Sequence, residues 1–346
     1  MIIFDNIVST LQQTGGISIL FNELEKRLQR DKVAFSKVDY KEAGFPHSQK
    51  QHKRFLERYR ACQVTTQNNK TIFHSTYYRT PSKKSNLLTV TTVHDFTYER
   101  YVGGIKRAVH STQKNHAINN SDIIICVSQN TKNDLLEYLP KTPNNKIHVV
   151  HNGVSEGFTP INPTHIENQV LFVGQRGGYK NFSSAIYALS MVKDIRISCV
   201  GGGSFTNSEL AFLEKNIPGR YAHLGYITEE QLNKEYNKSI ALIYPSLYEG
   251  FGIPILEAMR AGCPVISGHN SSIPEVAGDS ALLLERGSPD EIKDALNSLS
   301  NKELREKLIS QGLVQSNKFS WERTFTETLA LYQTLLPYPL LNSAID

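Results

Sequence analysis

The sequence predicts an α/β protein made of two doubly wound, Rossmann-like domains of similar size. The chain has 346 residues, which is more than one ordinary hydrophobic core supports. Nearly continuous apolar or β-branched runs alternate with amphipathic helical patterns, which is typical of parallel sheets covered by helices on both faces. This pattern stops at a turn-rich linker and then restarts. The predicted domains are residues 1–161 and 162–322, followed by a helical segment in 323–346.

The first domain opens with a strand, a turn and a helix. Residues 1–8 (MIIFDNIV) predict a strand, Gly15 and Gly16 a tight turn, and residues 18–28 an amphipathic helix. Two later runs, 86–95 (NLLTVTTVHD) and 121–128 (SDIIICVS), predict buried parallel strands. Together these elements favour a doubly wound sheet.

The second domain follows residues 151–164, which hold two prolines and several other turn residues. The apolar pattern then predicts strands at 168–174, 195–203, 222–226 and 239–247, and helices at 182–192 and 255–262. Residues 319–336 form a strong amphipathic pattern, which predicts a long helix near the end of the chain.

Composition narrows the class of protein. Hydrophobic residues make up 39% of the chain, enough for two cores, but no run of eighteen apolar residues occurs and no secretion leader is recognisable at the start. We therefore expect a cytoplasmic protein. Its four cysteines are far apart, which favours buried, reduced thiols over disulfides or a zinc site; they are Cys62, Cys126, Cys199 and Cys263.

Positive charge is concentrated in the first 120 residues, although the formal net charge is only +5. If both segments are helical, Arg54 and Arg58 share one face, and Lys106 and Lys114 share another. Such a face could attract a lipid-linked diphosphate or an anionic membrane surface. An ordinary solvated surface is an equally open interpretation. Nucleic acid is not expected, because no binding motif accompanies the charge.

The segment 248–266 (YEGFGIPILEAMRAGCPVI) joins two carboxylates to a glycine turn and a helix start. Glu249 is expected in the turn and Glu257 on the helix, eight positions later. The backbone amides near Phe251, Gly252 and Ile253 would be first-turn donors, and a diphosphate suits such donors. The alternative is an ordinary turn with two solvated glutamates.

The loop in FVGQRGGYKNF supplies positive charge after a predicted strand. Arg176 and Lys180 flank two glycines and are expected to point beyond the carboxyl edge of the sheet. There they would bind an anionic group such as a diphosphate. No paired aspartates of the DxD type, which often hold a metal ion, occur in the chain, so we expect a site without metal. Loop solubility is the alternative explanation for both cations.

Eight segments in order resemble the retaining GT-B glycosyltransferases of family 4, which carry the EX7E motif. They are FDNIVSTLQQTGGIS, TVHDFTYERY, SDIIICVSQNTKNDLL, VVHNGV, FVGQRGGYKNF, HLGYITEEQL, YEGFGIPILEAMRAGCPVI and SSIPEVAGDSALLL. The likeness is strongest to bacterial enzymes that build O-antigen or capsule polysaccharide. It implies that the two domains face each other across a cleft, and that the C-terminal helix crosses back to the first.

The resemblance also implies roles for residues. Glu249 would bind hydroxyls of the donor sugar and steady the oxocarbenium-like carbon, and Glu257 would bind the ribose. His94, at the end of a predicted strand, would face the donor sugar. Gly15 and Gly16 would let backbone amide approach the donor diphosphate and sugar. Tyr226, just past a strand end, could form a wall for the base, although a packing role is as well supported.

The expected substrates follow from the same resemblance. The donor would be a nucleotide diphosphate sugar, with GDP-mannose as the first candidate and UDP sugars next, and no further cofactor. The acceptor would be a lipid-linked glycan, which places the protein at the inner face of the plasma membrane.

Two other functions remain open at this point. One is a catalytically silent GT-B scaffold in polysaccharide assembly, against which the presence of Glu249, Glu257, Arg176 and Lys180 argues. The other is a nicotinamide-dependent oxidoreductase or epimerase, suggested by the glycines of CVGGGSF. That run does not continue as GxGxxG, which weakens the second alternative.

Overall fold

The computed structural model describes residues 1–11, 15–40, 48–66, 70–83, 85–162 and 165–336. The chain forms two compact units. The first consists of Met1–Gly153 and Trp321–Asp346, and the second of Val154–Ser320. The units therefore divide close to the predicted boundaries at 161/162 and 322/323. Of the predicted linker 151–164, the last two residues lie outside the described ones.

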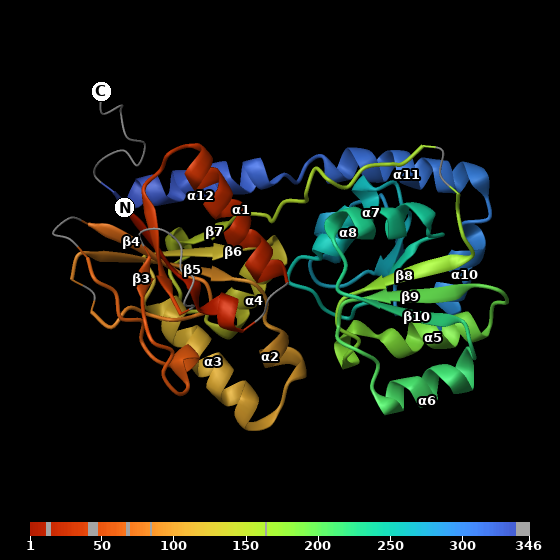
Figure 1. The fold of residues 1–346 in the computed structure, drawn as a ribbon, viewed down its shortest axis with the longest axis horizontal. Coiled ribbons are helices and arrows are strands. Elements are labelled where there is room, and N and C mark those ends of the chain that lie inside the picture. The colour runs from red at the N-terminus through yellow and green to blue at the C-terminus, as the bar shows by residue number, and fades with distance from the viewer. Residues whose placement is uncertain (12–14, 41–47, 67–69, 84, 163–164, 337–346) are drawn as a thin grey trace. The chain divides into compact units, whose positions relative to one another are not determined.

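The first unit contains a seven-stranded sheet in which every paired strand is parallel (Figure 1). The spatial order is β3-β2-β1-β4-β5-β6-β7, so the direction of winding reverses between β1 and β4. The strands are β1 (Ile2–Asp5), β2 (Phe35–Asp39), β3 (Gln49–Lys50), β4 (Thr71–Ser75), β5 (Leu87–Val93), β6 (Ile123–Cys126) and β7 (Ile147–Val149). β1, β4 and β6 are buried throughout, which explains their continuous apolar pattern.

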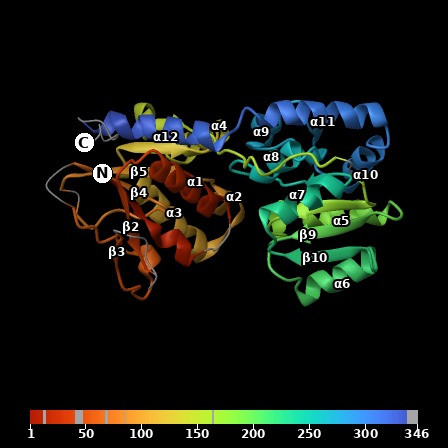
Figure 2. The ribbon, with the colours of Figure 1, turned by 45° about the horizontal axis from the view of Figure 1, so that its top comes forward.

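Helices connect these strands, and one further helix joins the unit from the end of the chain. They are α1 (Gly16–Arg30), α2 (Thr97–Tyr101), α3 (Gly104–Asn119), α4 (Gln129–Tyr138) and α12 (Trp321–Leu335), with short 3-10 turns η1 (Asn6–Thr10), η2 (Glu57–Tyr59) and η3 (Asn144–Lys146). α12 is the predicted C-terminal helix, and it runs beside α1 (Figures 1 and 2). Glu322 on α12 pairs with Arg27 and Arg30 on α1, and the hydroxyl of Tyr332 meets Nδ1 of the buried His74. The last helix therefore belongs to the first unit.

The second unit repeats the same topology with six parallel strands in the order β10-β9-β8-β11-β12-β13. The strands are β8 (Gln169–Val173), β9 (Arg196–Val200), β10 (Tyr221–Gly225), β11 (Leu242–Tyr244), β12 (Val265–Gly268) and β13 (Leu282–Leu284). The winding reverses between β8 and β11. Ligands of doubly wound sheets bind beyond the carboxyl ends of the strands at such a reversal.

Helices cover both faces of the second sheet. They are η4 (Gly178–Lys180), α5 (Phe182–Ser190), α6 (Asn207–Asn216), α7 (Glu229–Lys238), α8 (Ile253–Arg260), α9 (Ile273–Ala277), α10 (Pro289–Ser298) and α11 (Lys302–Ser316). α5 and α6 lie on one face, and α7 and α8 on the other (Figure 1). Capping boxes fix where α6, α7 and α10 begin, with Thr206, Thr228 and Ser288 as the caps. None of the described helices is long and apolar enough to cross a membrane.

Candidate functional site

The centre of the candidate site is an ion pair in the second unit. Lys180 lies in η4, after β8, and Glu249 lies in the turn after β11. Nζ of Lys180 donates to Oε1 of Glu249 over 2.6 Å and to the hydroxyl of Tyr244 over 3.3 Å. Both charged side chains are only 11% exposed. The two residues meet at the carboxyl edge where the winding reverses, which is the place expected for a ligand.

Aromatic rings surround this ammonium group. Nζ of Lys180 lies 5.2 Å from the ring centres of both Tyr179 and Tyr244. Burial, followed by the charge of Glu249, holds the pKa of Tyr244 well above its usual range, so its hydroxyl stays protonated. The low-dielectric surroundings strengthen any charge interaction of Lys180, including one with an entering phosphate.

The turn between β11 and α8 is held by two serines. Gly252 caps α8 with φ of 102°, a left-handed conformation that favours glycine. The hydroxyl of Ser272 reaches the carbonyl oxygens of Glu249 and Phe251, at 2.9 and 3.0 Å. Oγ of Ser271 accepts from the backbone N–H of Glu249 over 2.8 Å. Sequence reasoning gave these serines no role, although they stand in one of the motifs that carried the resemblance.

At the start of α8, Pro254 is the second helical residue and has no backbone N–H. The donors that the first turn of α8 can offer are therefore its remaining amides, among them those of Gly252 and Ile253. Phosphate binding by these amides, and by the neighbourhood of Phe251, stays a prediction.

Glu257 is the fifth of the eight residues of α8 and is buried. Burial raises the pKa of its carboxyl to about 7, although a hydrogen bond from the hydroxyl of Tyr236, 2.9 Å from Oε2, favours the ionised form. Glu257 therefore titrates near neutral pH instead of being a permanently charged group. Its binding of ribose hydroxyls stays a prediction.

The side chain of Arg176 is bound within the second unit, and its contact with a phosphate stays a prediction. Its side chain is 3% exposed and its Nε donates to Oε1 of Glu209 over 2.8 Å. Nη1 donates to the carbonyl of Gly201, and Nη2 to those of Gly203 and Ser204, over 2.9 to 3.2 Å. The guanidinium thus holds the loop after β9 and does not extend freely beyond the sheet. Lys180, by contrast, pairs directly with Glu249.

The same contacts explain the glycine run of CVGGGSF. A Cβ on Gly202 would lie 2.5 Å from the carbonyl oxygen of Gly174 and 2.9 Å from Nη1 of Arg176. Gly202 is therefore needed for close packing between the loops after β8 and β9. Because this packing explains the glycine run, the run no longer suggests a nicotinamide cofactor.

Tyr226 follows β10 and is 68% exposed. A Cβ built on Gly201 would lie 3.9 Å from Cε1 of its ring, so the ring stands beside the loop that Arg176 holds. An exposed ring at the carboxyl edge can stack on a base. The predicted base wall is compatible with this position and stays a prediction.

In the first unit, His94 follows β5 and is half-buried. Its backbone N–H donates to the hydroxyl of Tyr78 over 3.2 Å. Burial lowers the pKa of His94 to about 4, with Lys114 acting in the same direction and Asp95 opposing both. The imidazole is therefore neutral at pH 7 and offers hydrogen bonds without charge.

Gly15 and Gly16 form the start of α1. Gly15 is the cap, its carbonyl accepts from the N–H of Ile19 over 3.0 Å, and Gly16 is the first helical residue. Helix starts of this kind present backbone N–H groups to anions. Their contact with a donor stays a prediction.

The prediction that Arg54, Arg58, Lys106 and Lys114 form basic helical faces is wrong in part. Lys114 is fully buried and pairs with Glu99 over 2.8 Å, so it cannot meet a membrane or an acceptor from the surface. Arg54 pairs with Glu57 over 2.6 Å, and Arg58 donates to the hydroxyl of Tyr77 over 3.0 Å. Arg54 and Arg58 also lie outside any α-helix. Lys106, at the start of α3, is exposed as expected.

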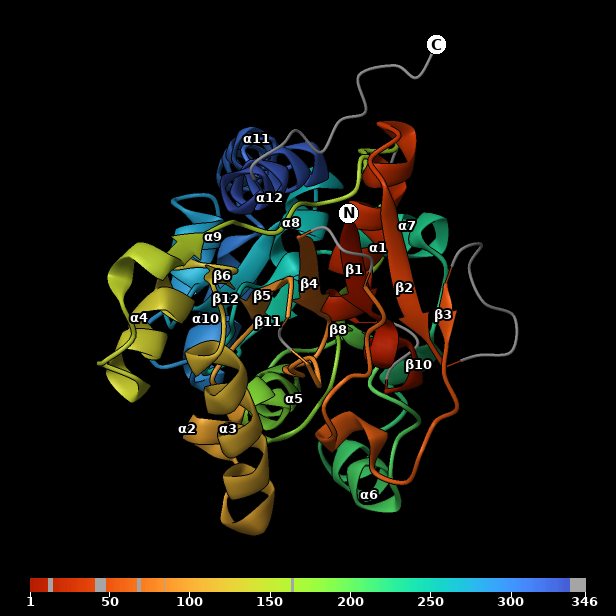
Figure 3. The same cartoon turned by 90° about the vertical axis from the view of Figure 1, so that its left-hand side faces the viewer.

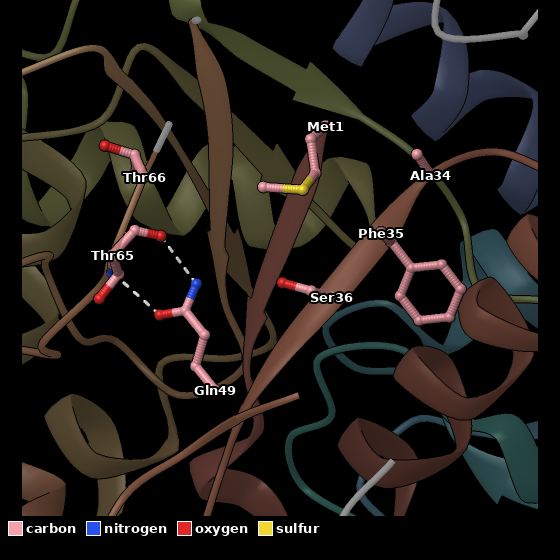
Figure 4. A pocket seen from close by; sticks show the side chains of 7 residues that line it. All are labelled: Met1, Ala34, Phe35, Ser36, Gln49, Thr65 and Thr66. Atoms are coloured by element: carbon pink, nitrogen blue, oxygen red, sulfur yellow. Dashed lines mark hydrogen bonds between the residues drawn. The ribbon is translucent and has the colours of Figure 1, made fainter. Parts of the chain in front are cut away.

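A pocket of about 570 Å³ lies elsewhere in the first unit (Figure 4). It is lined by Met1, Ala34, Phe35, Ser36, Gln49, Thr65 and Thr66. Met1, Phe35 and Gln49 stand at the amino ends of β1, β2 and β3, so this pocket opens at the edge opposite to the carboxyl ends. It contains none of the predicted site residues.

Histidine, cysteine and carboxylate side chains are the usual protein ligands of metal ions. Within the part of the chain that the structure describes, no group of three or more His, Cys, Asp or Glu side chains is placed to hold a metal ion. All four cysteines are free and buried, which confirms their prediction as reduced thiols.

Comparison with known proteins gives a consistent result. Residues 15–157 match the family model described as Glycosyltransferase Family 4, and residues 158–314 match the model described as Glycosyl transferases group 1. The chain is 28% identical over 286 residues to O-antigen chain mannosyltransferase B of Escherichia coli, covering 76% of this chain and 74% of that protein. It is 31% identical over 223 residues to the uncharacterized glycosyltransferase MJ1178 of Methanocaldococcus jannaschii, covering 64% of this chain and 62% of that protein. It thus spans less than two thirds of the second relative.

Solved structures resemble the chain over nearly its whole length. WaaG, a glycosyltransferase involved in lipopolysaccharide biosynthesis, matches with a TM-score of 0.73 and 12% identity, over 95% of this chain and 98% of that one. Sucrose-phosphate synthase from Thermosynechococcus elongatus matches with a TM-score of 0.73 and 17% identity, over 94% of each chain. Identities this low show a common fold and nothing further.

Proposed function

Because the chain belongs to the family 4 glycosyltransferases and has their GT-B fold, we propose that it is a retaining hexosyltransferase. In this proposal it moves a hexose, with mannose as the first candidate, from a nucleotide diphosphate sugar to a glycan. The observation that carries the proposal is the ion pair of Lys180 and Glu249 at the reversal point of the second sheet.

The ion pair suits a diphosphate leaving group. In the free protein Glu249 neutralises Lys180, and the donor diphosphate competes for the ammonium group. Once Lys180 binds phosphate oxygen, the carboxylate of Glu249 is released to accept hydrogen bonds from the sugar. Charge on the diphosphate grows as the glycosidic bond breaks, so a buried cation stabilises the transition state more than the ground state.

The transfer itself balances without a metal or cofactor. The bond between the anomeric carbon and the diphosphate oxygen breaks, and the acceptor hydroxyl oxygen bonds to the same face of that carbon. The acceptor proton passes to the departing phosphate oxygen. Glu249 lowers the energy of the oxocarbenium-like carbon through its charge, and the neutral His94 is proposed to hold a sugar hydroxyl.

The names of relatives support the choice of substrates. O-antigen chain mannosyltransferase B and O-antigen chain mannosyltransferase RfbU, of Salmonella typhimurium, are both similar to this chain. We therefore rank GDP-mannose first as donor and a growing, lipid-linked surface polysaccharide as acceptor, met at the cytoplasmic face of the membrane. UDP sugars rank next, since a structurally similar protein, Anabaena Alr3699/HepE, was solved with UDP-glucose.

A ligand screen followed by product analysis tests the proposal. Thermal shift is measured with nucleotide diphosphates and their sugars, because a ligand at 100 times its dissociation constant stabilises by about 2.7 kcal/mol. The best donor is then incubated with an acceptor glycan, and the new linkage is analysed by NMR. An α-linkage from an α-configured donor supports retention, whereas an inverted linkage contradicts the mechanism. Binding without hydrolysis or transfer favours the silent scaffold.

A further inference from the structure

Lys114 on α3 carries a buried charge that the proposed mechanism does not use. Its side chain is 0% exposed, and its Nζ donates to Oε2 of Glu99 and to the backbone carbonyl oxygen of Asp95, each over 2.8 Å. Taking an ammonium group out of water is costly unless the group is paired and hydrogen-bonded. A buried ion pair adds little stability beyond that of apolar side chains of the same volume, so stability alone does not account for this lysine.

The contacts of Lys114 lead to His94 by two routes. Asp95, whose carbonyl oxygen Lys114 binds, directly follows His94 in the turn after β5. By the second route, Nζ of Lys114 lies 4.3 Å from the ring centre of Phe96 and 5.5 Å from that of Tyr78. Both distances suit a cation–π contact. The hydroxyl of Tyr78 accepts from the backbone N–H of His94 over 3.2 Å, so the same ring supports the turn.

Two helices fix the ammonium group in one place. α2 and α3 lie side by side (Figures 1 and 3). Glu99 on α2 accepts from Lys114 at one carboxylate oxygen, and from the hydroxyl of Ser111 at the other over 2.8 Å. Oδ1 of Asp95 accepts from the backbone N–H of Thr97 over 2.9 Å, which closes the turn before α2. The turn of His94, α2 and α3 are therefore joined through Lys114.

Among the described residues, the charged groups that act on the imidazole of His94 are Asp95 and Lys114. Burial lowers the pKa of His94 to about 4, Asp95 opposes this, and Lys114 acts in the same direction as burial. Two other titratable neighbours are uncharged at pH 7. Burial lowers the pKa of His74 on β4 to about 3 and holds the pKa of Tyr78 well above its usual range. Lys114 is therefore the positive charge that opposes a proton on His94.

We propose that Lys114 is a positioning residue, whose ammonium group ties the turn of His94 to α2 and α3 and keeps a positive charge beside the imidazole. The charge opposes protonation of the ring, so that His94 meets a sugar hydroxyl as a neutral hydrogen-bonding group. Lys114 touches no substrate itself, because its side chain is fully buried. It acts through His94 alone.

The inference deepens the proposed function, on which it rests for the contact between His94 and the sugar. The effect of Lys114 on the imidazole, however, is a property of the free protein and can be measured without substrate. An ordinary structural ion pair predicts a different result. Its removal would lower stability but leave the titration of His94 where it is.

Histidine titration by NMR tests the inference on the full chain with isotope-labelled histidine. The resonance of His94 is identified with the variant His94→Gln, and its pKa is compared between wild type and Lys114→Met. We expect a higher pKa in Lys114→Met, because the positive charge beside the ring is gone. The matched control is Lys146→Met. Nζ of the half-buried Lys146 donates to the backbone carbonyl of Ser121 over 3.0 Å, at the opposite edge of the sheet, so this variant should leave the pKa of His94 unchanged.

A second variant keeps the test open if Lys114→Met folds poorly, since that change leaves Glu99 buried without its cation. Lys114→Met/Glu99→Gln removes both charges and leaves an amide oxygen that can accept from Ser111. The pKa of His94 should rise in this variant too, because the ammonium group, and not the carboxylate of Glu99, acts on the imidazole. Circular dichroism and thermal melting show which of the two variants is folded.

Transfer rates give a reading that depends on the proposed function. The rate of the folded variant is divided by that of the wild type at pH 7 and again at pH 5. Glu257 titrates alike in both proteins, so its effect cancels in this quotient. An imidazole at its ordinary pKa of about 6.5 is neutral in only about one molecule in thirty at pH 5, so the quotient should fall between about twofold and about thirtyfold.

Equal pKa values of His94 in the wild type and in the folded Lys114 variant would overturn the inference, as would an equal rise in Lys146→Met. A raised pKa with an unchanged quotient of rates would support the action of Lys114 on His94 and contradict the contact between His94 and the sugar. A raised pKa in a chain that transfers no sugar from any donor would likewise support the inference, while the proposed function alone fails.

Discussion

The hydroxyl of Tyr236 on α7 donates a hydrogen bond of 2.9 Å to Oε2 of Glu257 on α8. Tyr236 is itself fully buried, so a rigid neighbouring helix fixes the orientation of the carboxylate. The hydrogen bond favours the ionised form of Glu257, while burial favours the protonated form and raises the pKa to about 7. The balance between these two effects decides at which pH the carboxylate of Glu257 is ionised and can accept hydrogen bonds from a nucleotide sugar.

Glu257→Gln should raise stability at alkaline pH and weaken donor binding. The folded state raises the pKa of Glu257 from 4.5 to about 7, so it favours the protonated carboxyl. The resulting stabilisation is complete below pH 4.5 and is lost as the pH rises through about 7. A neutral amide escapes this loss. Melting temperatures of wild type and variant should therefore differ above pH 7, in favour of the variant, and converge near pH 4.5. A variant that melts lower than the wild type at alkaline pH would contradict the buried titration.

Tyr236→Phe should shift the pH dependence of donor binding. Without the hydroxyl the ionised form of Glu257 loses a hydrogen bond, so the pKa of the carboxyl rises further. Donor affinity, measured by calorimetry across the neutral and alkaline range, should recover only at a higher pH than in the wild type. Tyr221→Phe, which removes an exposed hydroxyl bound to Glu214, is the matched control and should leave the profile unchanged. An identical profile for Tyr236→Phe and wild type would exclude Glu257 as the titrating group.

Lys180→Met should slow turnover by about two to three orders of magnitude, the usual effect of removing one preorganised donor from developing charge. It should also lower stability, because Glu249 is left buried without its cation. The double variant Lys180→Met/Glu249→Gln should regain stability but not activity. Steady-state kinetics and thermal melting of both variants check this. Near-normal turnover of Lys180→Met would remove Lys180 from the diphosphate site.

Transfer should persist in excess chelator. In the proposed mechanism the positive charge at the diphosphate comes from Lys180 and the start of α8, so no divalent ion is required. Initial rates are compared with and without chelator, and after adding back magnesium or manganese. If chelator abolishes transfer and either ion restores it, the metal-free mechanism is wrong.

The sequence could predict the fold because both sheets are parallel and buried. Runs such as residues 121–128 are nearly continuous in apolar residues only when helices cover both faces, and β6 is buried throughout. The sequence also predicts that Lys180 and Glu249 lie at the same edge of the sheet, since both follow strands whose carboxyl ends share that edge. It does not predict their direct ion pair, because the pair depends on the exact lengths of two loops.

Two cations have partners that the local sequence pattern does not indicate. Lys114 matched the spacing of an exposed helical face, but its partner Glu99 lies on α2, and nothing in the local pattern of α3 indicates that contact. Arg176 stood in a loop expected to bind phosphate, but the carbonyl groups it binds belong to the loop after β9. Backbone carbonyls have no sequence signature, so such contacts become visible only in the folded structure.

Arg176 therefore gives the sharpest test of how the nucleotide is held. If its guanidinium positions the loop beside Tyr226, Arg176→Ala should weaken nucleoside monophosphate and diphosphate by the same factor. If it binds the diphosphate, the loss should be larger for the diphosphate. Calorimetry with GMP and GDP, and with UMP and UDP, separates the two cases.

The structural role of Arg176 also predicts a loss of stability. Four hydrogen bonds to the chain disappear in Arg176→Ala, three of them to backbone carbonyls, so its melting temperature should fall. Arg176→Lys should restore little, because a single ammonium group cannot replace the fork of a guanidinium. Arg323 in α12, an exposed side chain whose Nε pairs with Glu327 one turn along the same helix, provides the matched control as Arg323→Ala. Two results together would contradict the structural role: Arg176→Ala melts like this control, and it loses more affinity for the diphosphate than for the monophosphate. They would indicate that Arg176 binds the phosphate groups.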